Sequence, residues 1–427
     1  MFRKNDLSEL VSAGIITDTT AEKIHEYYIS KGESSTNRLF IAFGILGAIL
    51  VGLGIILIVA HNWDELSRST KSILAFLPMI VGQLFCAFTL VKKSESVAWI
   101  EGSAAFLIFA VGACIALISQ IYNIPGDLSS FLLTWVILCV PLIYVMKSSI
   151  ASLLCLIGIT AYACQVSYWS YPSGKPYLYW LLLLTILPYY YLLFKAKPLS
   201  NFTTFHNWAI PLSIVITLGT FATKYAELMW IAYFSLLGTI YLIGNSTYFD
   251  QKKLRNNGYK IIGSLGTIIL LLYLSFNYFW DDLISESFYL SDIIKTPEFI
   301  VSVIISLIGI ATLVWQYKQN SSILIKPIAP IFLLFILTFS IGIYSPIAVI
   351  LINLFVFGIG ILTIRVGANQ DHLGILNYGL LIITALVVCR FFDSQISFVI
   401  RGLLFVLVGI GFFTANYLML KKRKTHE

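Results

Sequence analysis

Residues 39–60 read LFIAFGILGAILVGLGIILIVA, an apolar run without a charged side chain. A transmembrane helix needs about 20 such residues to cross the hydrocarbon core of a bilayer. We therefore predict that this run spans a membrane. Gly44, Ala48 and Gly52 place small side chains on one face of the helix, which allows another helix to pack closely.

The rest of the chain repeats this apolar pattern. Of 427 residues, 58% are hydrophobic and only 11% are charged, whereas soluble domains contain about 25% charged residues. The sequence predicts an all-α fold, a polytopic transmembrane helix bundle of about 14 spans, several of them short for a bilayer. The predicted spans are residues 39–60, 72–91, 99–119, 128–146, 150–166, 177–194, 208–223, 228–244, 259–280, 298–316, 326–341, 346–364, 373–389 and 397–419.

The lysines and arginines orient these spans. Cytoplasmic loops of membrane proteins are enriched in Lys and Arg, and most of the 28 cations fall on one side when both termini are placed in the cytoplasm. The outer segments would hold only Arg68, Lys71, Lys175, Lys224, Lys295, Arg390 and Arg401. We expect a bacterial cytoplasmic (inner) membrane protein. The net charge of +7 does not indicate nucleic acid, because the cations flank apolar runs.

Residues 1–38 are polar and precede the first span. Their apolar spacing predicts a short cytoplasmic helical hairpin, in which Gly14 ends the first helix. Thr19 and Glu22 have the spacing of a capping box for the second helix. Residues 39–150 and 151–427 are predicted to form an N-terminal and a C-terminal membrane region.

No motif of a known reaction occurs, so we do not expect an enzyme with a recognisable catalytic centre. The histidines and cysteines are scattered without metal-ligand spacing, which predicts no metal site and no cofactor. Tryptophans near span ends are typical of interfacial anchors. They are Trp99, Trp180, Trp208, Trp230, Trp280 and Trp315.

Polar residues at membrane depth are costly, and they are therefore the candidate ligand-binding residues. Three groups lie at outer span ends, and Glu101 lies near an inner end. The candidates are His61, Asn62, Trp63, Asp64, Arg68, Glu101, Gln120, Tyr122, Asp127, Arg390, Asp393 and Arg401.

Each candidate group also has a plain structural explanation. Asp64 and Asp127 are suitable helix caps, and Arg390 and Asp393 have the spacing of an ion pair. Glu101 could reach the interface, or it could be a buried carboxylate suited to proton transfer. We predict that Asp64, Asp127 and Asp393 converge on one extracytoplasmic site.

Several separated motifs resemble one bacterial family of predicted membrane proteins, called domain of unknown function 2157. They include the LVSAGII segment at Leu10–Ile16, AHNWDELSR at Ala60–Arg68 and SQIYNIPGD at Ser119–Asp127. The resemblance covers roughly residues 5–150. It implies a membrane location and a helical architecture, and it assigns no catalytic residue.

Three classes of function remain open. The leading one is a transporter or flippase-like protein with an extracytoplasmic-facing polar site. The alternatives are a structural or assembly partner in the cell envelope and a membrane enzyme acting on an envelope or lipid-linked substrate. We expect the lipid bilayer, and other membrane proteins, as partners, and no nucleic acid.

Overall fold

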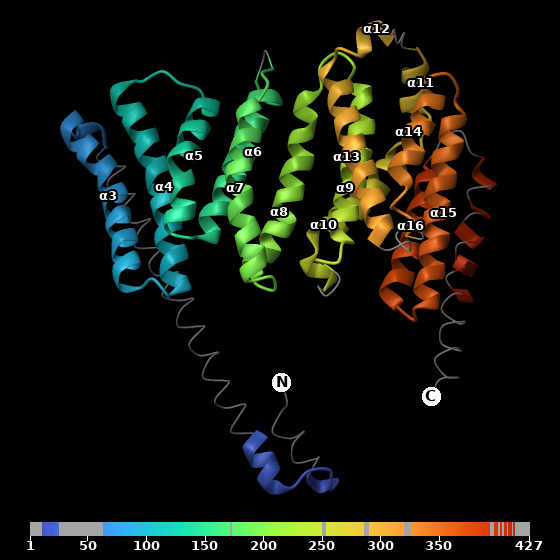
Figure 1. The fold of residues 1–427 in the computed structure, drawn as a ribbon, viewed down its shortest axis with the longest axis horizontal. Coiled ribbons are helices and arrows are strands. Elements are labelled where there is room, and N and C mark those ends of the chain that lie inside the picture. The colour runs from blue at the N-terminus through green and yellow to red at the C-terminus, as the bar shows by residue number, and fades with distance from the viewer. Residues whose placement is uncertain are drawn as a thin grey trace. The chain divides into compact units, whose positions relative to one another are not determined.

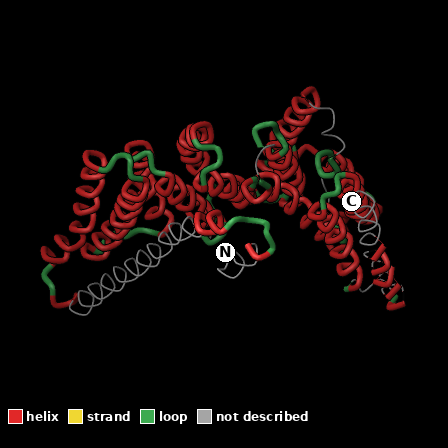
Figure 2. The backbone as a smooth tube through the Cα atoms, turned by 90° about the horizontal axis from the view of Figure 1, so that it is seen from below, coloured by secondary structure: helices red, strands yellow, loops and turns green. Residues whose placement is uncertain are grey.

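The computed structural model describes residues 11–24, 63–170, 173–249, 253–285, 290–319, 326–392 and parts of 397–414. Within these residues the secondary structure is helical and contains no strand (Figures 1 and 2). The all-α prediction is therefore confirmed. The chain divides into two compact units, Met1–Phe76 and Leu77–Glu427, which we describe separately.

The first unit contains the described part of the predicted hairpin. Gly14 has a φ of +68° and its amide donates to the carbonyl of Val11 at 3.0 Å, so this glycine ends a helix as predicted. Residues 18–24 are helical, and Thr17 Oγ1 accepts from the Thr20 amide at 3.4 Å. The predicted capping box at Thr19 is therefore wrong, because the helix begins two residues earlier than a cap at Thr19 requires and Thr17 caps it.

The same unit contains the 3-10 turn η1 (Trp63–Glu65) and the start of α3 (Arg68–Lys92). Ser67 Oγ accepts from the Thr70 amide at 3.2 Å and caps α3.

The second unit continues with long helices that run alternately up and down (Figure 1). The helices are α4 (Val97–Tyr122), α5 (Leu128–Val145), α6 (Ser149–Ser167), α7 (Tyr177–Ala196), α8 (Asn201–Leu218), α9 (Met229–Gly244), α10 (Gly258–Tyr273), α11 (Tyr278–Ser285), α12 (Leu290–Ile293), α13 (Pro297–Gln319), α14 (Ile331–Gly342), α15 (Ile347–Asn369) and α16 (Leu373–Phe391). Three 3-10 turns join some of them: η2 (Gly219–Phe221), η3 (Ala226–Leu228) and η4 (Leu254–Asn256).

Nine of the described helices are long and apolar enough to cross a membrane, or ten if the bent pair α10–α11 is counted as one span. The chain is thus a multi-pass membrane protein. The predicted spans 39–60 and 397–419 lie wholly or partly outside the described residues. The other predicted spans each overlap a helix, but residues 259–280 divide between α10 and α11, and neither α8 nor the 12-residue α14 is among the nine.

Helix α8 begins at Asn201, earlier than the predicted start at residue 208. Its first turns carry Thr203, His206 and Asn207, which are polar but fully buried. These side chains are covered by neighbouring helices, so they can be polar. Hydropathy therefore underestimated the length of the helix at its N-terminal end.

The apolar core of the second unit follows the helix order. One cluster joins α4–α8 through Ile143, Leu156 and Ile186. Another joins α9–α16 through Phe234 and Phe335, whose rings stack at 3.8 Å. Helix α9 is the most buried candidate span, with 61% of its apolar window inside the protein. Helix α9 is therefore the central helix against which the surrounding helices pack.

Candidate functional site

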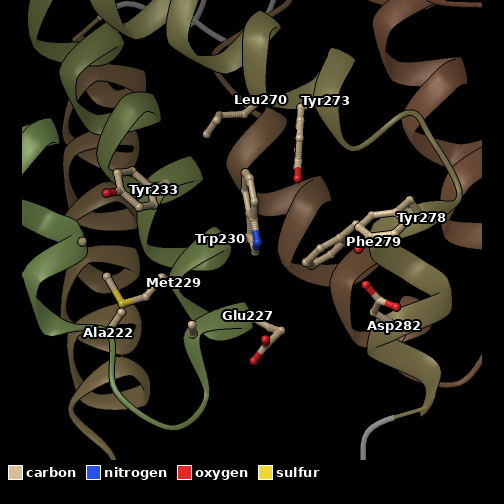
Figure 3. A pocket seen from close by; sticks show the side chains of 12 residues that line it. Ala222, Glu227, Met229, Trp230, Tyr233, Leu270, Tyr273, Tyr278, Phe279 and Asp282 are labelled. Atoms are coloured by element: carbon tan, nitrogen blue, oxygen red, sulfur yellow. The ribbon is translucent and has the colours of Figure 1, made fainter. Parts of the chain in front are cut away.

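A cavity of about 590 Å³ lies where α9 begins and α10 ends. Figure 3 shows it between the segment that holds η2 and η3, the first turn of α9, and the bent pair α10–α11. Tyr278, which lines the cavity on the α11 side, is 75% exposed. The aromatic and acidic lining residues are Glu227, Trp230, Tyr233, Tyr273, Tyr278, Phe279 and Asp282.

The aromatic rings of the cavity hold one another in place. Trp230 stacks on Tyr273, with ring centroids 5.3 Å apart and an interplanar angle of 14°. Phe279 meets Trp230 at 5.5 Å and 67°. Such pairs add to the stability of an apolar surface and fix its shape. The cavity therefore has one rigid aromatic wall built from α9, α10 and α11.

The bent pair α10–α11 forms a second side of the cavity. Helices α10 and α11 meet at a bend of 71°. A break leaves backbone carbonyls without helical partners, and at membrane depth these need other donors. Trp280 Nε1 donates to the carbonyl of Leu274 at 2.8 Å, and Asn353 Nδ2 donates to that of Ser275 at 3.0 Å. Side chains of α11 and α15 thus stabilise the break.

Arg390 supports the same break from α16. Its Nη2 donates to Ser275 Oγ at 3.0 Å, and its guanidinium lies 4.5 Å from the ring centroid of Phe276. It is not among the lining residues, so it acts on the cavity through the bend.

Trp280 is fully buried, and a Cβ on Gly342 would lie only 2.0 Å from its ring. The predicted role of Trp280 as an interfacial anchor is therefore wrong. Trp280 follows the bend between α10 and α11, and its ring is buried inside the protein.

The third wall is the segment 219–228 between α8 and α9. Glu298, at the start of α13, is fully buried. Its Oε1 accepts from the amide and hydroxyl of Thr223, the latter at 2.6 Å, and from the amide of Tyr225 at 3.3 Å. Glu298 begins the predicted span 298–316, but nothing in the sequence indicated that segment 219–228 covers its carboxylate.

Lys175 binds this segment from the other side. Its Nζ donates to the carbonyls of Thr220 and Ala222, both at 3.0 Å. Partial burial lowers the pKa of Lys175, and the negative charge of Glu298 opposes that effect. An acid and a base from distant parts of the chain therefore hold the wall in one position.

The candidates near the first span belong to the first unit. Trp63 and Asp64 form η1, where Lys71 Nζ lies 5.7 Å from the Trp63 ring centroid, and Arg68 begins α3. Asp64 and Arg68 are exposed. His61 and Asn62 lie outside the described residues.

Asp127 caps the N-terminus of α5, which is the structural role that the sequence predicted for it. Its carboxylate accepts from the Ser130 amide and the Ser129 hydroxyl, both at 2.8 Å. These hydrogen bonds lower the pKa of Asp127 to about 2. Gln120 and Tyr122 are exposed at the end of α4. Asp393 and Arg401 lie outside the described residues, so the convergence of the three aspartates stays a prediction.

Glu101 is buried within the protein. Its carboxylate accepts from Ser148 Oγ at 2.5 Å, from the Ser149 amide at 2.9 Å and from the Ile150 amide at 2.8 Å. It therefore accepts hydrogen bonds from the first amides of α6. Its negative charge also stabilises the N-terminus of α6, which carries the positive end of the helix dipole. This role is structural, and sequence analysis had not considered it.

A buried polar cluster lies next to this cap. His206 Nε2 is 2.9 Å from Ser152 Oγ, and its Nδ1 is 2.8 Å from the carbonyl of Phe202. The ring also stacks on Tyr190 at 5.9 Å. Every polar ring atom of His206 thus has a partner. Among the described residues no group of His, Cys, Asp and Glu could hold a metal ion.

The comparison with known families agrees with the sequence resemblance. Residues 8–152 match a family model described as a predicted membrane protein (DUF2157). No curated protein and no solved structure matches the chain. The cavity residues, between Gly219 and Asp282, all lie outside the matched region.

Proposed function

We propose that the protein is a transporter or flippase-like membrane protein whose ligand enters the cavity from the extracytoplasmic side. The observation that carries this proposal is the cavity of about 590 Å³ beside a span broken by 71°. Ligand pockets typically measure about 300–1,000 Å³. Broken helices recur at the binding sites of transporters, because their ends and exposed backbone contact the ligand.

The orientation of the cavity rests on the charge rule. Lys253, Arg255 and Lys260 lie between α9 and α10 or in the first turn of α10, at the ends of these helices opposite to the cavity. Cationic loops favour the cytoplasmic side, which supports an extracytoplasmic position for the cavity.

The alternative functions have less support from the described residues. A scaffold needs contact surfaces but no cavity of this size. An enzyme needs a nucleophile, base or metal site among its lining groups, whereas this lining is mainly aromatic with two carboxylates. We therefore retain ligand uptake as the function that the geometry supports best.

The test is sided labelling of a cysteine placed in the cavity. Ala226 lines it and is exposed, so Ala226→Cys should react with a membrane-impermeant maleimide added outside intact cells. Ser94, exposed between α3 and α4 on the predicted inner side, supplies the control Ser94→Cys, which should react only after permeabilisation. The parent chain measures the background from its native cysteines, five of which are buried. Labelling of Ala226→Cys only after permeabilisation would contradict the proposal.

A further inference from the structure

We infer that the cavity binds the hydrocarbon chain of a bilayer lipid, which enters sideways from the outer leaflet. The inference rests on the proposed function for the site and for its extracytoplasmic position. It adds the substrate class, a lipid and not a dissolved solute, and the route by which that lipid reaches the cavity. It follows from the surface next to the cavity, from the lining and from the volume.

An exposed apolar stripe on α10 leads into the cavity. Leu265, Ile269 and Tyr273 are all exposed, and their spacing of four residues places them on one face of the helix. Helices α10 and α11 together make a candidate membrane span. Exposed apolar side chains of a span contact lipid tails, which are equally apolar. Tyr273 also lines the cavity, so the surface that contacts lipid is continuous with it.

Aromatic side chains form the rim of the cavity on both sides of the bend. Tyr273 ends α10 and Tyr278 begins α11, and both are exposed lining residues. Trp230 stacks on Tyr273 and holds its ring in place. Tyr and Trp combine an apolar ring with one polar atom and are enriched where lipid chains meet headgroups. The rim therefore suits the part of a lipid at which its chains begin.

The lining is apolar at one end of the cavity and acidic at the other. Figure 3 shows Leu270 and Tyr273 at one end, and Glu227 and Asp282 toward the other. Both carboxylates already make interactions within the chain, so the lining does not select an ion. The predicted orientation places the end with Leu270 deeper in the membrane. An apolar interior below a polar outer edge has the same order as a lipid chain below its headgroup.

The volume of the cavity, about 590 Å³, favours an occupant from the bilayer. Atoms that line a void lose dispersion contacts, and protein interiors hold few voids larger than a water molecule. Water occupies a cavity stably where each molecule finds about two to four polar partners, which Met229, Leu270 and Phe279 do not supply. A chain from the adjoining lipid restores the contacts without leaving water. A lipid chain is therefore the favoured occupant.

The direct test is photocrosslinking of the full-length chain in proteoliposomes. The probe is a phosphatidylethanolamine with a diazirine in the middle of one acyl chain, and mass spectrometry locates the crosslinked residues. Leu265 and Ile269 face lipid and serve as references. Met229 lines the cavity but is only 4% exposed, so lipid around the protein does not reach it. We expect crosslinks at Met229 and Leu270 in addition to the references. Crosslinks at the references alone would overturn the inference.

Filling the cavity should remove only the inner crosslinks. Ala222 lines the cavity, so Ala222→Trp should lower crosslinking at Met229 and Leu270 severalfold. Crosslinking at Leu265 should stay at the parent yield, which also shows that the variant is folded in the membrane. The matched control is Leu181→Trp, at an exposed position of α7 outside the lining, and it should change neither signal. A parent yield at Met229 in the Ala222→Trp protein would contradict a chain inside the cavity.

A soluble probe separates a lipid from a dissolved solute. Glycerophosphoethanolamine with a diazirine on its headgroup lacks acyl chains, and it should not crosslink to Met229. Crosslinking by this probe and not by the lipid would overturn the lipid inference but leave the cavity a ligand site. Labelling of Ala226→Cys only after permeabilisation would instead contradict the proposed function.

Discussion

At the scale of single residues, two buried glutamates use the same chemistry for different purposes. Glu101 accepts from three donors at the start of α6, and Glu298 accepts from three donors in the segment before α9. Glu101 lies in the second turn of α4 and satisfies amides at the start of α6, whereas Glu298 lies in the first turn of α13 and satisfies amides of the segment between α8 and α9. In lipid, where water cannot bind these amides, such contacts fix how the helices pack.

Removing the Glu101 carboxylate should destabilise the protein. Glu101→Ala leaves two buried amides and one hydroxyl without this acceptor, which should cost about 2–4 kcal/mol. The midpoint of unfolding in dodecyl sulfate should fall accordingly. Glu95→Ala, at an exposed turn position two residues before α4, is the control and should leave the midpoint unchanged. Equal midpoints for both variants would show that Glu101 does not cap α6.

The side-chain carboxyl of Asp127 should have an unusually low pKa. Hydrogen bonds to the charged form lower its pKa to about 2, from an ordinary value of 3.8. Because the folded pKa is depressed, the cap contributes fully above about pH 4 and is lost as the pH falls through 2. Carbon-13 NMR of labelled aspartate, with Asp127→Asn for assignment, measures this midpoint. A midpoint near 3.8 would mean that the cap is not formed.

Local sequence predicted some of these residues and not others. The caps at Gly14 and Asp127 depend on neighbours within a few positions, which the sequence displays. Glu298 binds residues 73–75 positions away, and Arg390 binds Ser275 115 positions away. Such contacts are set by helix packing, so composition and spacing could not indicate them.

At the scale of elements, the break between α10 and α11 shapes the cavity. The sequence predicted one span over residues 259–280, because hydropathy does not register a bend. The structure divides this segment after Tyr273, and side chains from α11, α15 and α16 bind the residues of the break. The location of a helix could thus be predicted, whereas its interruption depends on distant donors.

Gly342 tests this bend, because its missing side chain makes room for Trp280. Gly342→Ala places a Cβ 2.0 Å from a fully buried ring, and overpacking of this kind costs about 1–3 kcal/mol. The unfolding midpoint in dodecyl sulfate should therefore fall. Gly358→Ala on α15 has nothing within 4 Å of the new Cβ and should not lower the midpoint. Similar behaviour of both variants would contradict the packing described at the bend.

At the scale of the whole molecule, the charge pattern predicts one orientation for the spans. Reporter fusions after Ser94 and after Lys260 should both indicate cytoplasm, because both follow an even number of crossings in the predicted order. An alkaline phosphatase reporter should be inactive at these two sites and active after Gly174. Activity after Ser94 or Lys260 would break the predicted topology.

The most direct test of ligand uptake is movement across the membrane of proteoliposomes. Uptake of radiolabelled small solutes and the dithionite sensitivity of acyl-labelled fluorescent phospholipid measure solute transport and lipid translocation separately. We predict protein-dependent movement of at least one, reduced severalfold by Ala222→Trp, which fills the cavity. Leu181→Trp, at a 60% exposed position of α7 outside the lining, should retain the parent rate. Movement no faster than in protein-free liposomes, or a parent rate in Ala222→Trp, would contradict the account.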